Sequence, residues 1–354
     1  MDYKGRLGAL AGSLDQPLLV TRPAHLRYLL GFTGSNGYLL VRPDGTSVFV
    51  TDGRYGEAAE PLVAALDGSR IEVYTADLFA ALDGVLGGLE RVGLEASAVT
   101  WDFMRTLDAK TSSQPVAVAG KVERLRRIKD DEEVEALRRA AAAGDAAYAS
   151  LHRLLDGAAT ERDLAWRLIT EMRDHGGDPA AWDPIVAFGP GASVPHHETG
   201  PTRIGPGLLL LDYGCVVDGY HSDMSRTLWR GGHPDPDLAR AHEAVAEAQQ
   251  AAIDAVAPGV PCGVVDAAAR DVLASHGLAE HFLHSTGHGV GLEIHEEPWI
   301  RRDNEDPLEA GNVITIEPGV YLPGKGGVRI EDMLLVTPEG ALLLTESPRE
   351  MMPT

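Results

Sequence analysis

Three histidines lie close together in the last third of the chain, and their spacing suggests a reactive site. They are His284, His288 and His295, with glycines at 287, 289 and 291 between them. Glycine lets a backbone pass close to a metal or ligand and disfavours a long regular helix, so we expect a strand or a glycine-rich loop here. A single histidine is more simply a hydrogen-bonded residue without a ligand. The cluster becomes a metal site only if carboxylates elsewhere complete its ligands.

Four carboxylates stand at positions that could complete such a set. Asp212 follows the apolar run 208–211, and Glu317 follows the β-branched run 313–316. Each pattern is typical of a buried strand whose end delivers an acid to the rim of a site. Asp223 and Glu331 lie in short polar stretches beyond these strands. With the histidine cluster, these acids form a candidate set of ligands for divalent cations.

The composition excludes several classes of partner. The chain has 354 residues, which favours two domains. Its formal net charge of −22 disfavours nucleic acid and anionic membranes, which both reward clustered Lys and Arg. We see neither an apolar leader nor an apolar stretch of the roughly 20 residues that a membrane span needs, so we expect a soluble, cytoplasmic protein. The two cysteines, Cys215 and Cys262, exclude a disulfide scaffold and a thiolate zinc cluster.

Short apolar runs alternate with turns in the first part of the chain. The expected elements are strands at 18–20, 37–41, 48–50 and 71–74, and a helix over 78–89. The turn 42–45 marks a hairpin between the second and third strands. This pattern indicates a small α/β domain, residues 1–125, without a catalytic cluster of its own.

The remaining residues, 126–354, mix helices with the strands that end in acids. The capping pattern from Thr160 to Asp163 marks one helix start. The further expected elements are helices over 134–155, 237–256 and 263–275, and a strand over 184–188.

Other chemistries lack their motifs. Residues 319–325 have the spacing of a phosphate loop, but Gly326 stands where Ser or Thr is required, so we predict a hairpin. No nucleophile elbow marks a reactive Ser or Cys. What remains is a histidine and four acids.

The set Asp212, Asp223, His288, Glu317 and Glu331 carries a resemblance to a known family. From about residue 125 onward the chain resembles the pita-bread metallopeptidases, which include methionine aminopeptidase, aminopeptidase P and prolidase. The matching stretches are 211–214, 219–227, 284–296, 316–319 and 327–332. The N-terminal part is similar to the creatinase-type domain of the Xaa-Pro enzymes in residues 28–35 and 51–55. The resemblance implies an α+β protein with a creatinase-like N-terminal domain followed by a pita-bread catalytic domain.

The resemblance also implies roles for these residues. Asp212 would chelate one metal ion, His288 and Glu317 would hold a second, and Asp223 and Glu331 would bridge both. Mn²⁺ is favoured, with Co²⁺ or Zn²⁺ as alternatives, because oxygen-rich ligands with one imidazole suit these ions. Glu317 would also shuttle a proton, and His295 would hydrogen-bond to the substrate or the tetrahedral intermediate. The resemblance places four residues around the substrate and its proline ring: His196, His284, Tyr321 and Arg329.

The implied activity is hydrolysis of the bond between an N-terminal residue and proline. Prolidase, which cuts Xaa-Pro dipeptides, is preferred over aminopeptidase P, which cuts longer peptides. A catalytically inactive scaffold that only binds a partner is the alternative of another class, and the intact ligand set argues against it. The family implies a homodimer. Ser225 stands where the family usually has Thr, which keeps the hydroxyl, and plain loop or packing roles are preferred for His197, His221 and Trp299.

Overall fold

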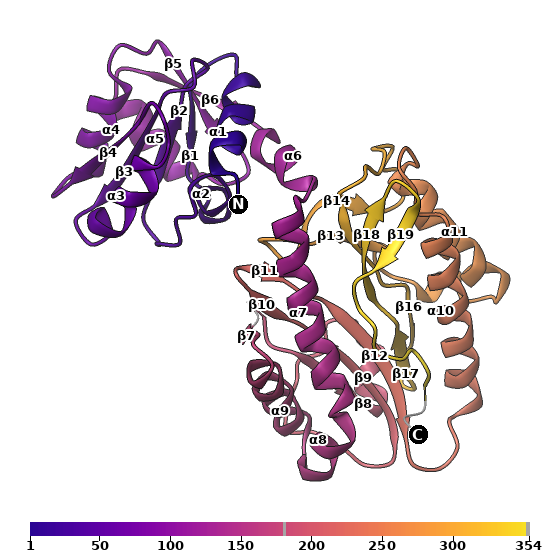
Figure 1. The fold of residues 1–354 in the computed structure, drawn as a ribbon. Helices are drawn as coiled ribbons and strands as arrows, with labels where there is room; N and C mark the ends of the chain where they lie inside the picture. The colour runs from indigo at the N-terminus through magenta and orange to yellow at the C-terminus, as the bar shows by residue number, and fades with distance from the viewer. Residues whose placement is uncertain (180–181, 352–354) are drawn as a thin grey trace. The chain divides into compact units, whose positions relative to one another are not determined.

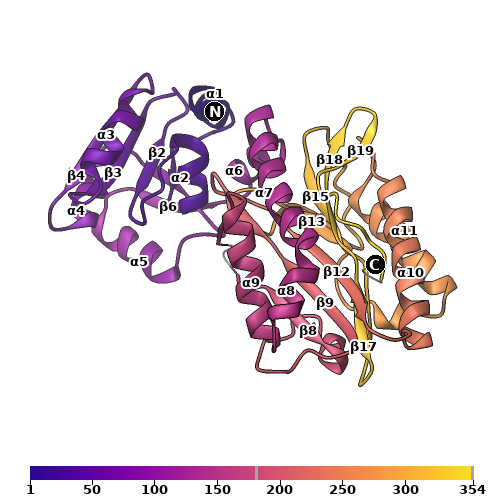
Figure 2. The same cartoon turned by 60° about the horizontal axis from the view of Figure 1, so that its bottom comes forward.

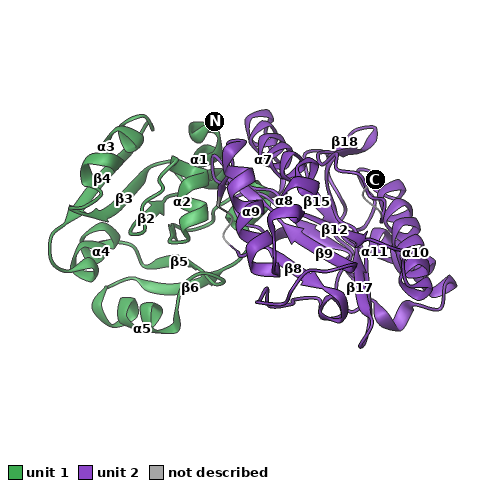
Figure 3. Ribbon diagram, turned by 90° about the horizontal axis from the view of Figure 1, so that it is seen from below, with its two compact units in different colours: residues 1–126 green, residues 127–354 purple. Residues whose placement is uncertain are grey.

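The computed structural model of the chain describes residues 1–179 and 182–351. It divides into two compact units, Met1–Arg126 and Arg127–Thr354, which Figure 3 shows in different colours. Each unit has its own sheets and its own apolar core. Among the described residues, no helix combines the length and the apolar character that a membrane span requires.

The N-terminal unit is built on a six-stranded mixed sheet with the order β4-β3-β2-β1-β5-β6. Its strands are β1 (Leu18–Val20), β2 (Tyr38–Val41), β3 (Ser47–Asp52), β4 (Ser69–Tyr74), β5 (Arg91–Glu95) and β6 (Gln114–Val118). Its helices are α1 (Tyr3–Gly12), α2 (Pro23–Leu30), α3 (Gly56–Ala64), α4 (Leu78–Leu86), α5 (Trp101–Lys110) and α6 (Lys121–Arg127), the last of which runs across the division. Buried residues of the sheet pack against α4 and α5.

The four strands predicted in this unit are present, and two further strands were missed. The predicted hairpin joins β2 to β3, closed by a hydrogen bond from the Arg42 N–H to the Thr46 carbonyl. The predicted helix over 78–89 ends earlier, at Leu86, because Gly87 leaves the helical conformation. The missed strands, β5 and β6, begin with polar residues and carry a glycine or a proline, so neither shows a clear strand period.

The C-terminal unit places its strands between two groups of helices (Figures 1 and 2). Its larger sheets have the orders β12-β9-β8 and β14-β13-β15-β18-β19, beside a small sheet β11-β10-β7 and the hairpin β16-β17. The strands are β7 (Asp178–Pro179), β8 (Ile185–Phe188), β9 (Gly207–Tyr213), β10 (Cys215–Val217), β11 (Tyr220–His221), β12 (Met224–Arg230), β13 (Gly287–Gly289), β14 (Glu296–Ile300), β15 (Val313–Ile316), β16 (Gly319–Leu322), β17 (Gly326–Arg329), β18 (Asp332–Thr337) and β19 (Gly340–Leu343).

The helices of this unit cover the two larger sheets separately. They are α7 (Asp131–Ala149), α8 (Leu151–Gly157), α9 (Glu161–Asp174), α10 (Pro236–Asp254) and α11 (Cys262–Ser275), with short 3₁₀ helices η1 (Gly189–Ser193) and η2 (Ala279–His281). One core joins α7, α8 and α9 to the sheet that contains β9, and another joins α10 and α11 to the sheet that contains β15. The predicted hairpin at residues 319–325 is present as β16-β17.

The helix predicted over 134–155 is wrong as a single element. It is interrupted at Ser150, where ψ is −1° and the backbone N–H bonds to Tyr148 as well as to Ala146. The Ser150 hydroxyl also donates to Glu171 of α9, at 2.8 Å. The break and this contact fall at the same residue, although the apolar pattern continues through it. The predicted start of α9 is confirmed, since Thr160 and Asp163 form a capping box.

Candidate metal centre

Strand pairing brings Asp212 and Asp223 together. β9 and β12 are antiparallel, and Asp212 near the end of β9 lies opposite Ser225 in β12. Asp223 stands two residues before Ser225, just ahead of β12. The apolar run before Asp212 is fully buried in this sheet, so its register places both acids at the same strand ends.

A second antiparallel pair delivers the other acids. In β15-β18, Ile316 lies opposite Asp332, so Glu317 and Glu331, which adjoin them, come from neighbouring strand ends. β13 pairs with β15 and carries His288 as its central residue. A Cβ on Gly287 would lie 1.9 Å from a backbone oxygen of β15, so glycine is needed there for the strands to pair. The glycine-rich stretch is therefore partly a strand and partly a loop.

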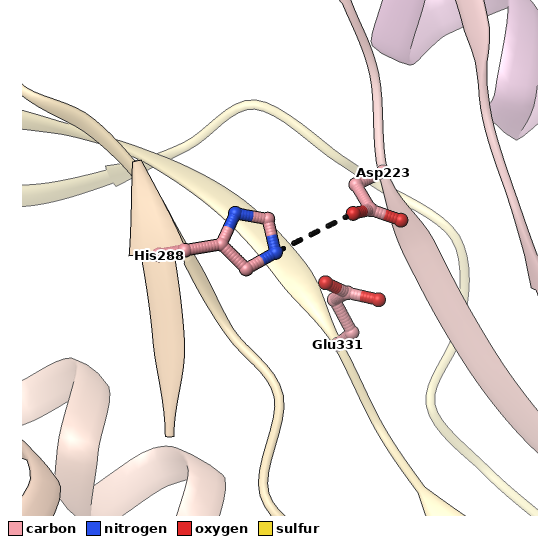
Figure 4. Close-up of side chains that lie close together, drawn as sticks. All are labelled: Asp223, His288 and Glu331. Atoms are coloured by element: carbon pink, nitrogen blue, oxygen red, sulfur yellow. Dashed lines mark ion pairs between the residues drawn. The ribbon is translucent and has the colours of Figure 1, made fainter. Parts of the chain in front are cut away.

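Four of the five predicted ligands lie together: His288 and three acids beside it. One ligand atom each from Asp223, His288 and Glu331 lies within 4.8 Å of the others, and Figure 4 shows the three side chains converging from separate segments of the chain. The Nε2 atom of His288 lies 3.6 Å from Asp223 Oδ2 and 3.5 Å from Glu317 Oε1. We call Asp223, Glu317, Glu331 and His288 the acid cluster.

The fifth predicted ligand, Asp212, has a different partner. Its Oδ2 accepts a hydrogen bond from Arg329 Nη2 at 2.5 Å, in an ion pair whose side chains are 16% and 4% exposed. Asp212 still lies close enough to Asp223 for its charge to raise the pKa of that carboxyl. It therefore borders the acid cluster while forming an ion pair with Arg329.

Burial and mutual repulsion disfavour ionised acids in the cluster. Burial is the main cause that raises the pKa values of Asp223 and Glu331, and neighbouring carboxylates raise them further. Burial raises the pKa of Glu317 to about 8, with a contribution from Asp212 and opposition from Arg329. Burial also lowers the pKa of His288 to about 3, helped by His295, so its imidazole is neutral. Neutral imidazole is the form that binds metals.

The polar atoms of the cluster fit divalent cations. The Nδ1 of His288 faces the Gly289 carbonyl at 2.9 Å, which fixes the proton there and directs the Nε2 lone pair at the acids. Glu331 accepts a bond from Ser225 at Oε2, but its buried Oε1 has no hydrogen-bond partner in the described part of the chain. An unpartnered carboxylate oxygen beside further acids is unfavourable unless a cation compensates it. The donor set of oxygens with one imidazole suits Mn²⁺, Co²⁺ and Zn²⁺.

Three predicted substrate residues form a hydrogen-bonded line, which we call the Tyr321 relay. Arg329 Nη1 donates to the Tyr321 hydroxyl at 2.7 Å, and that hydroxyl lies 2.8 Å from His284 Nε2. The other His284 nitrogen, Nδ1, lies 2.8 Å from the Ser285 carbonyl. Because a carbonyl only accepts, the proton belongs on Nδ1 and Tyr321 donates to Nε2. Burial lowers the pKa of His284 to about 4, and the positive charge of Arg329 lowers it further.

The two remaining residues predicted for the site, His295 and His196, have exposed side chains. The His295 ring packs against His288, with centroids 4.4 Å apart, and against Trp299 at 6.3 Å. Burial lowers the pKa of His295, and the charge of His196 contributes in the same direction. His196 also acts on His284, so it lies near both histidines. The relay residues and His295 thus border the acid cluster, and His196 lies beside His284 and His295.

Comparison with known proteins decides the family. Residues 135–338 match the model of metallopeptidase family M24, and residues 13–128 match that of the creatinase/prolidase N-terminal domain. The chain belongs to metallopeptidase family M24. The predicted family and fold class are thereby confirmed: this M24 enzyme is a metallopeptidase with a creatinase-type domain before its catalytic domain, and its family implies divalent metal ions.

Relatives align with this M24 enzyme over nearly its whole length. An Xaa-Pro dipeptidase of Pyrococcus furiosus is 32% identical, covering 99% of this chain and all of its own. A solved Xaa-Pro dipeptidase from Bacillus anthracis is 32% identical, with a TM-score of 0.94 and 99% of each chain covered. A solved X-Pro aminopeptidase from Thermotoga maritima is 29% identical, with a TM-score of 0.85 and 96% and 97% covered.

A buried ionic network behind the acid cluster was missed from the sequence. All five N–H groups of Arg226 are engaged, by Asp332 and by backbone carbonyls that include those of Ser225 and Glu331. Asp332 in turn also accepts bonds from other side chains, namely Gln249, Thr345 and Arg349. We call this group the Arg226 network. The sequence did contain one sign of this network: Arg226 lies within the buried part of β12, and a buried charge needs a partner.

The histidines given plain roles have structural partners. His197 Nε2 lies 3.0 Å from a carboxylate oxygen of Glu161, and His221 Nδ1 lies 3.0 Å from the Gly291 carbonyl. Trp299 packs beside His288 and His295, so it lies at the site itself rather than apart from it.

Proposed function

We propose that this M24 metallopeptidase hydrolyses the bond between an N-terminal residue and proline, and that it acts as an Xaa-Pro dipeptidase. The acid cluster, with its neutral imidazole and its unpartnered carboxylate oxygen, is the observation that carries the proposal. Full-length similarity to proteins named Xaa-Pro dipeptidase supports the substrate class. The Tyr321 relay beside the cluster supplies polar groups for a short peptide.

The proposed ligands are Asp212, Asp223, His288, Glu317 and Glu331, which would hold two divalent cations, preferably Mn²⁺. Bound cations supply a polarised carbonyl and a water of lowered pKa. Their charge also offsets the repulsion among carboxylates that burial makes costly. For Asp212 to serve, it must share its carboxylate between Arg329 and a cation, or exchange one for the other.

The proposed proton carrier is Glu317. Cleavage before proline releases a secondary amine, which must gain a proton as the C–N bond breaks. Glu317 is largely buried next to His288, where a proton taken from water can be kept from bulk solvent and passed on. His295 makes no side-chain hydrogen bond within the described residues, so it is free to donate one to the oxygen on which negative charge develops.

Recognition of the proline end decides between the two candidate activities. A dipeptidase must bind a free carboxylate. Within the described residues Arg329 has one N–H left, because its others contact Ser225, Pro195, Tyr321 and Asp212. The exposed His196 is a further donor beside this site, and we propose that it and Arg329 bind the carboxylate. A longer peptide would leave such donors unpaired, at a cost of roughly 1–3 kcal/mol per group.

The test is kcat/KM on matched peptides such as Ala-Pro and Ala-Pro-Ala with Mn²⁺-loaded protein. We expect the tripeptide to be cut at least about tenfold less efficiently, the factor that 1.4 kcal/mol gives. Equal or better tripeptide cleavage would instead make the enzyme an aminopeptidase P, a second candidate supported by the likeness to the Thermotoga maritima enzyme. No cleavage of either peptide would favour an inactive scaffold.

We also propose a homodimer and a cytoplasmic location. Both cysteines, Cys215 and Cys262, are free and buried, which suits a reducing compartment. The N-terminal unit supplies none of the proposed metal ligands, so we assign it a role in assembly. Light scattering at working concentration should give twice the mass of one chain, and a monomeric mass would contradict the dimer.

A further inference from the structure

The position of His295 depends on the loop that carries it. This loop spans residues 290–295, between β13 and β14. The His295 side chain is exposed and, among the described residues, is held only by ring packing on His288 and Trp299. No hydrogen bond that the structure describes fixes the ring, so the loop backbone must set its position.

Glu296, which directly follows His295, fills the inside of this loop. A Cβ on Gly291 would lie 2.5 Å from Glu296 Oε1, so the loop closes tightly over the carboxylate. The Glu293 N–H points at Glu296 Oε2 from 3.4 Å. The carboxylate therefore joins the two ends of the turn that presents His295.

Lys129 compensates the charge of this carboxylate from outside the loop. Its Nζ lies 2.8 Å from Glu296 Oε1, and the two side chains are 1% and 9% exposed. The Lys129 backbone N–H donates to the Gly311 carbonyl at 2.9 Å, and Lys129 directly precedes Asp130, the N-cap of α7. Lys129 thus ties the loop to the start of a long helix. Removing Lys129 would take a positive charge away from this buried carboxylate, which costs stability.

We propose that Lys129 and Glu296 are a positioning pair that sets the place of His295 for catalysis. The inference rests on the proposed role of His295 in peptide hydrolysis. Neither residue is one of the proposed metal ligands, although the charge of Glu296 acts on His288.

Lys129→Met should lower kcat on Ala-Pro by about tenfold or more, because small misplacements of a catalytic group cost this much. KM should change less than about twofold, and metal content by elemental analysis should stay at the wild-type value. Lys129→Arg, which keeps the charge, should recover most of the rate. Arg153→Met, which breaks the Arg153–Glu171 pair between α8 and α9, is the matched control and should leave kcat unchanged.

The deciding measurement repeats Lys129→Met in a His295→Ala background. If the pair acts through His295, the double variant has the same kcat as His295→Ala alone. An equal further loss in that background would overturn the proposal, because it would show a general structural effect. If Lys129→Met fails to fold by circular dichroism, Glu296→Gln takes its place in the same cycle.

Hydrogen exchange gives a readout that does not need activity. Lys129→Met should exchange faster over residues 290–296 than wild type, whereas Arg153→Met should not. Unchanged exchange in that segment would overturn the proposal. This result does not depend on whether the wild-type protein cuts Xaa-Pro peptides. Failure of the proposed function is seen separately, as absence of wild-type turnover.

Discussion

Glu331 and Asp332 are neighbours in the chain, yet they lie in opposite electrostatic surroundings. Asp332 is 1% exposed and belongs to the Arg226 network, where both of its oxygens accept hydrogen bonds. Glu331 is 2% exposed and faces other acids, with one oxygen lacking a partner among the described residues. Two adjacent buried carboxylates thus differ in whether protein groups compensate their charge.

This difference separates a structural role from a chemical one. A buried acid that is fully paired holds the fold in place, whereas one that is left under-compensated costs stability and is kept for binding or catalysis. The two sites are connected, since Arg226 also donates to the Glu331 carbonyl. The paired network therefore fixes the backbone from which the unpaired carboxylate points into the acid cluster.

Glu331→Gln tests the chemical side of the comparison and should have the largest effect. We expect loss of bound metal and a fall in kcat/KM of about 10³-fold or more, since a bound metal contributes several kcal/mol to the transition state. Asp223→Ala should behave alike. Elemental analysis and steady-state kinetics provide the measurements. Tight retention of metal with normal turnover in either variant would contradict the assignment of these acids as bridging ligands.

Asp332→Asn is the matched change on the structural side. It keeps the shape but leaves Arg226 short of its counter-charge, so it should destabilise the fold by about 3–5 kcal/mol. Metal affinity should fall by no more than about 10–100-fold, the usual cost of disturbing a group behind a ligand. Urea unfolding and calorimetric metal titration measure the two quantities. A stable Asp332→Asn protein without metal would reverse the roles given to the two acids.

His295→Ala should slow catalysis while leaving metal binding intact. We expect kcat to fall by about 10²-fold, the common scale for losing a hydrogen-bonding group that stabilises an intermediate. Metal content should match the wild type, because His295 contacts the acid cluster only through ring packing. If metal is lost and turnover follows its occupancy, His295 belongs with the ligands instead.

Asp212 and Glu317 could be predicted because each stands at the end of a strand with a strong apolar pattern, whereas Asp223, Glu331 and His288 lie in polar or glycine-rich stretches and were assigned through the family resemblance. Their convergence is a consequence of strand register, which the apolar pattern specifies well. The ion pair between Asp212 and Arg329 could not be predicted from the sequence, because it depends on the side-chain conformations of both residues within the site. The break at Ser150 was also missed, because the apolar pattern of the helix continues through it. The metal-binding roles of the acids stay predictions.

The pH dependence of stability is the smallest predicted effect, and it isolates the unpaired acids. The folded-state pKa of Glu317 is raised to about 8, and those of Asp223 and Glu331 are raised as well. A raised carboxyl pKa means that the folded state holds more protons than the unfolded state above pH 4.5. Stability without metal must therefore fall as pH rises towards the folded pKa.

The histidines change stability in a different pH window. The pKa values of His288 and His284 are lowered to about 3 and about 4, so their contribution is lost as pH falls below 6.5 and is constant above it. Between pH 7 and 8, each acid that stays protonated in the folded state should lower the free energy of unfolding by about 1.4 kcal/mol per pH unit. We thus expect chelator-treated protein to melt about 2 °C or more lower at pH 8 than at pH 7. Mn²⁺-loaded protein should lack this decrease and Glu317→Gln should reduce it, whereas parallel melting curves with and without metal would show that the acids are not under-compensated.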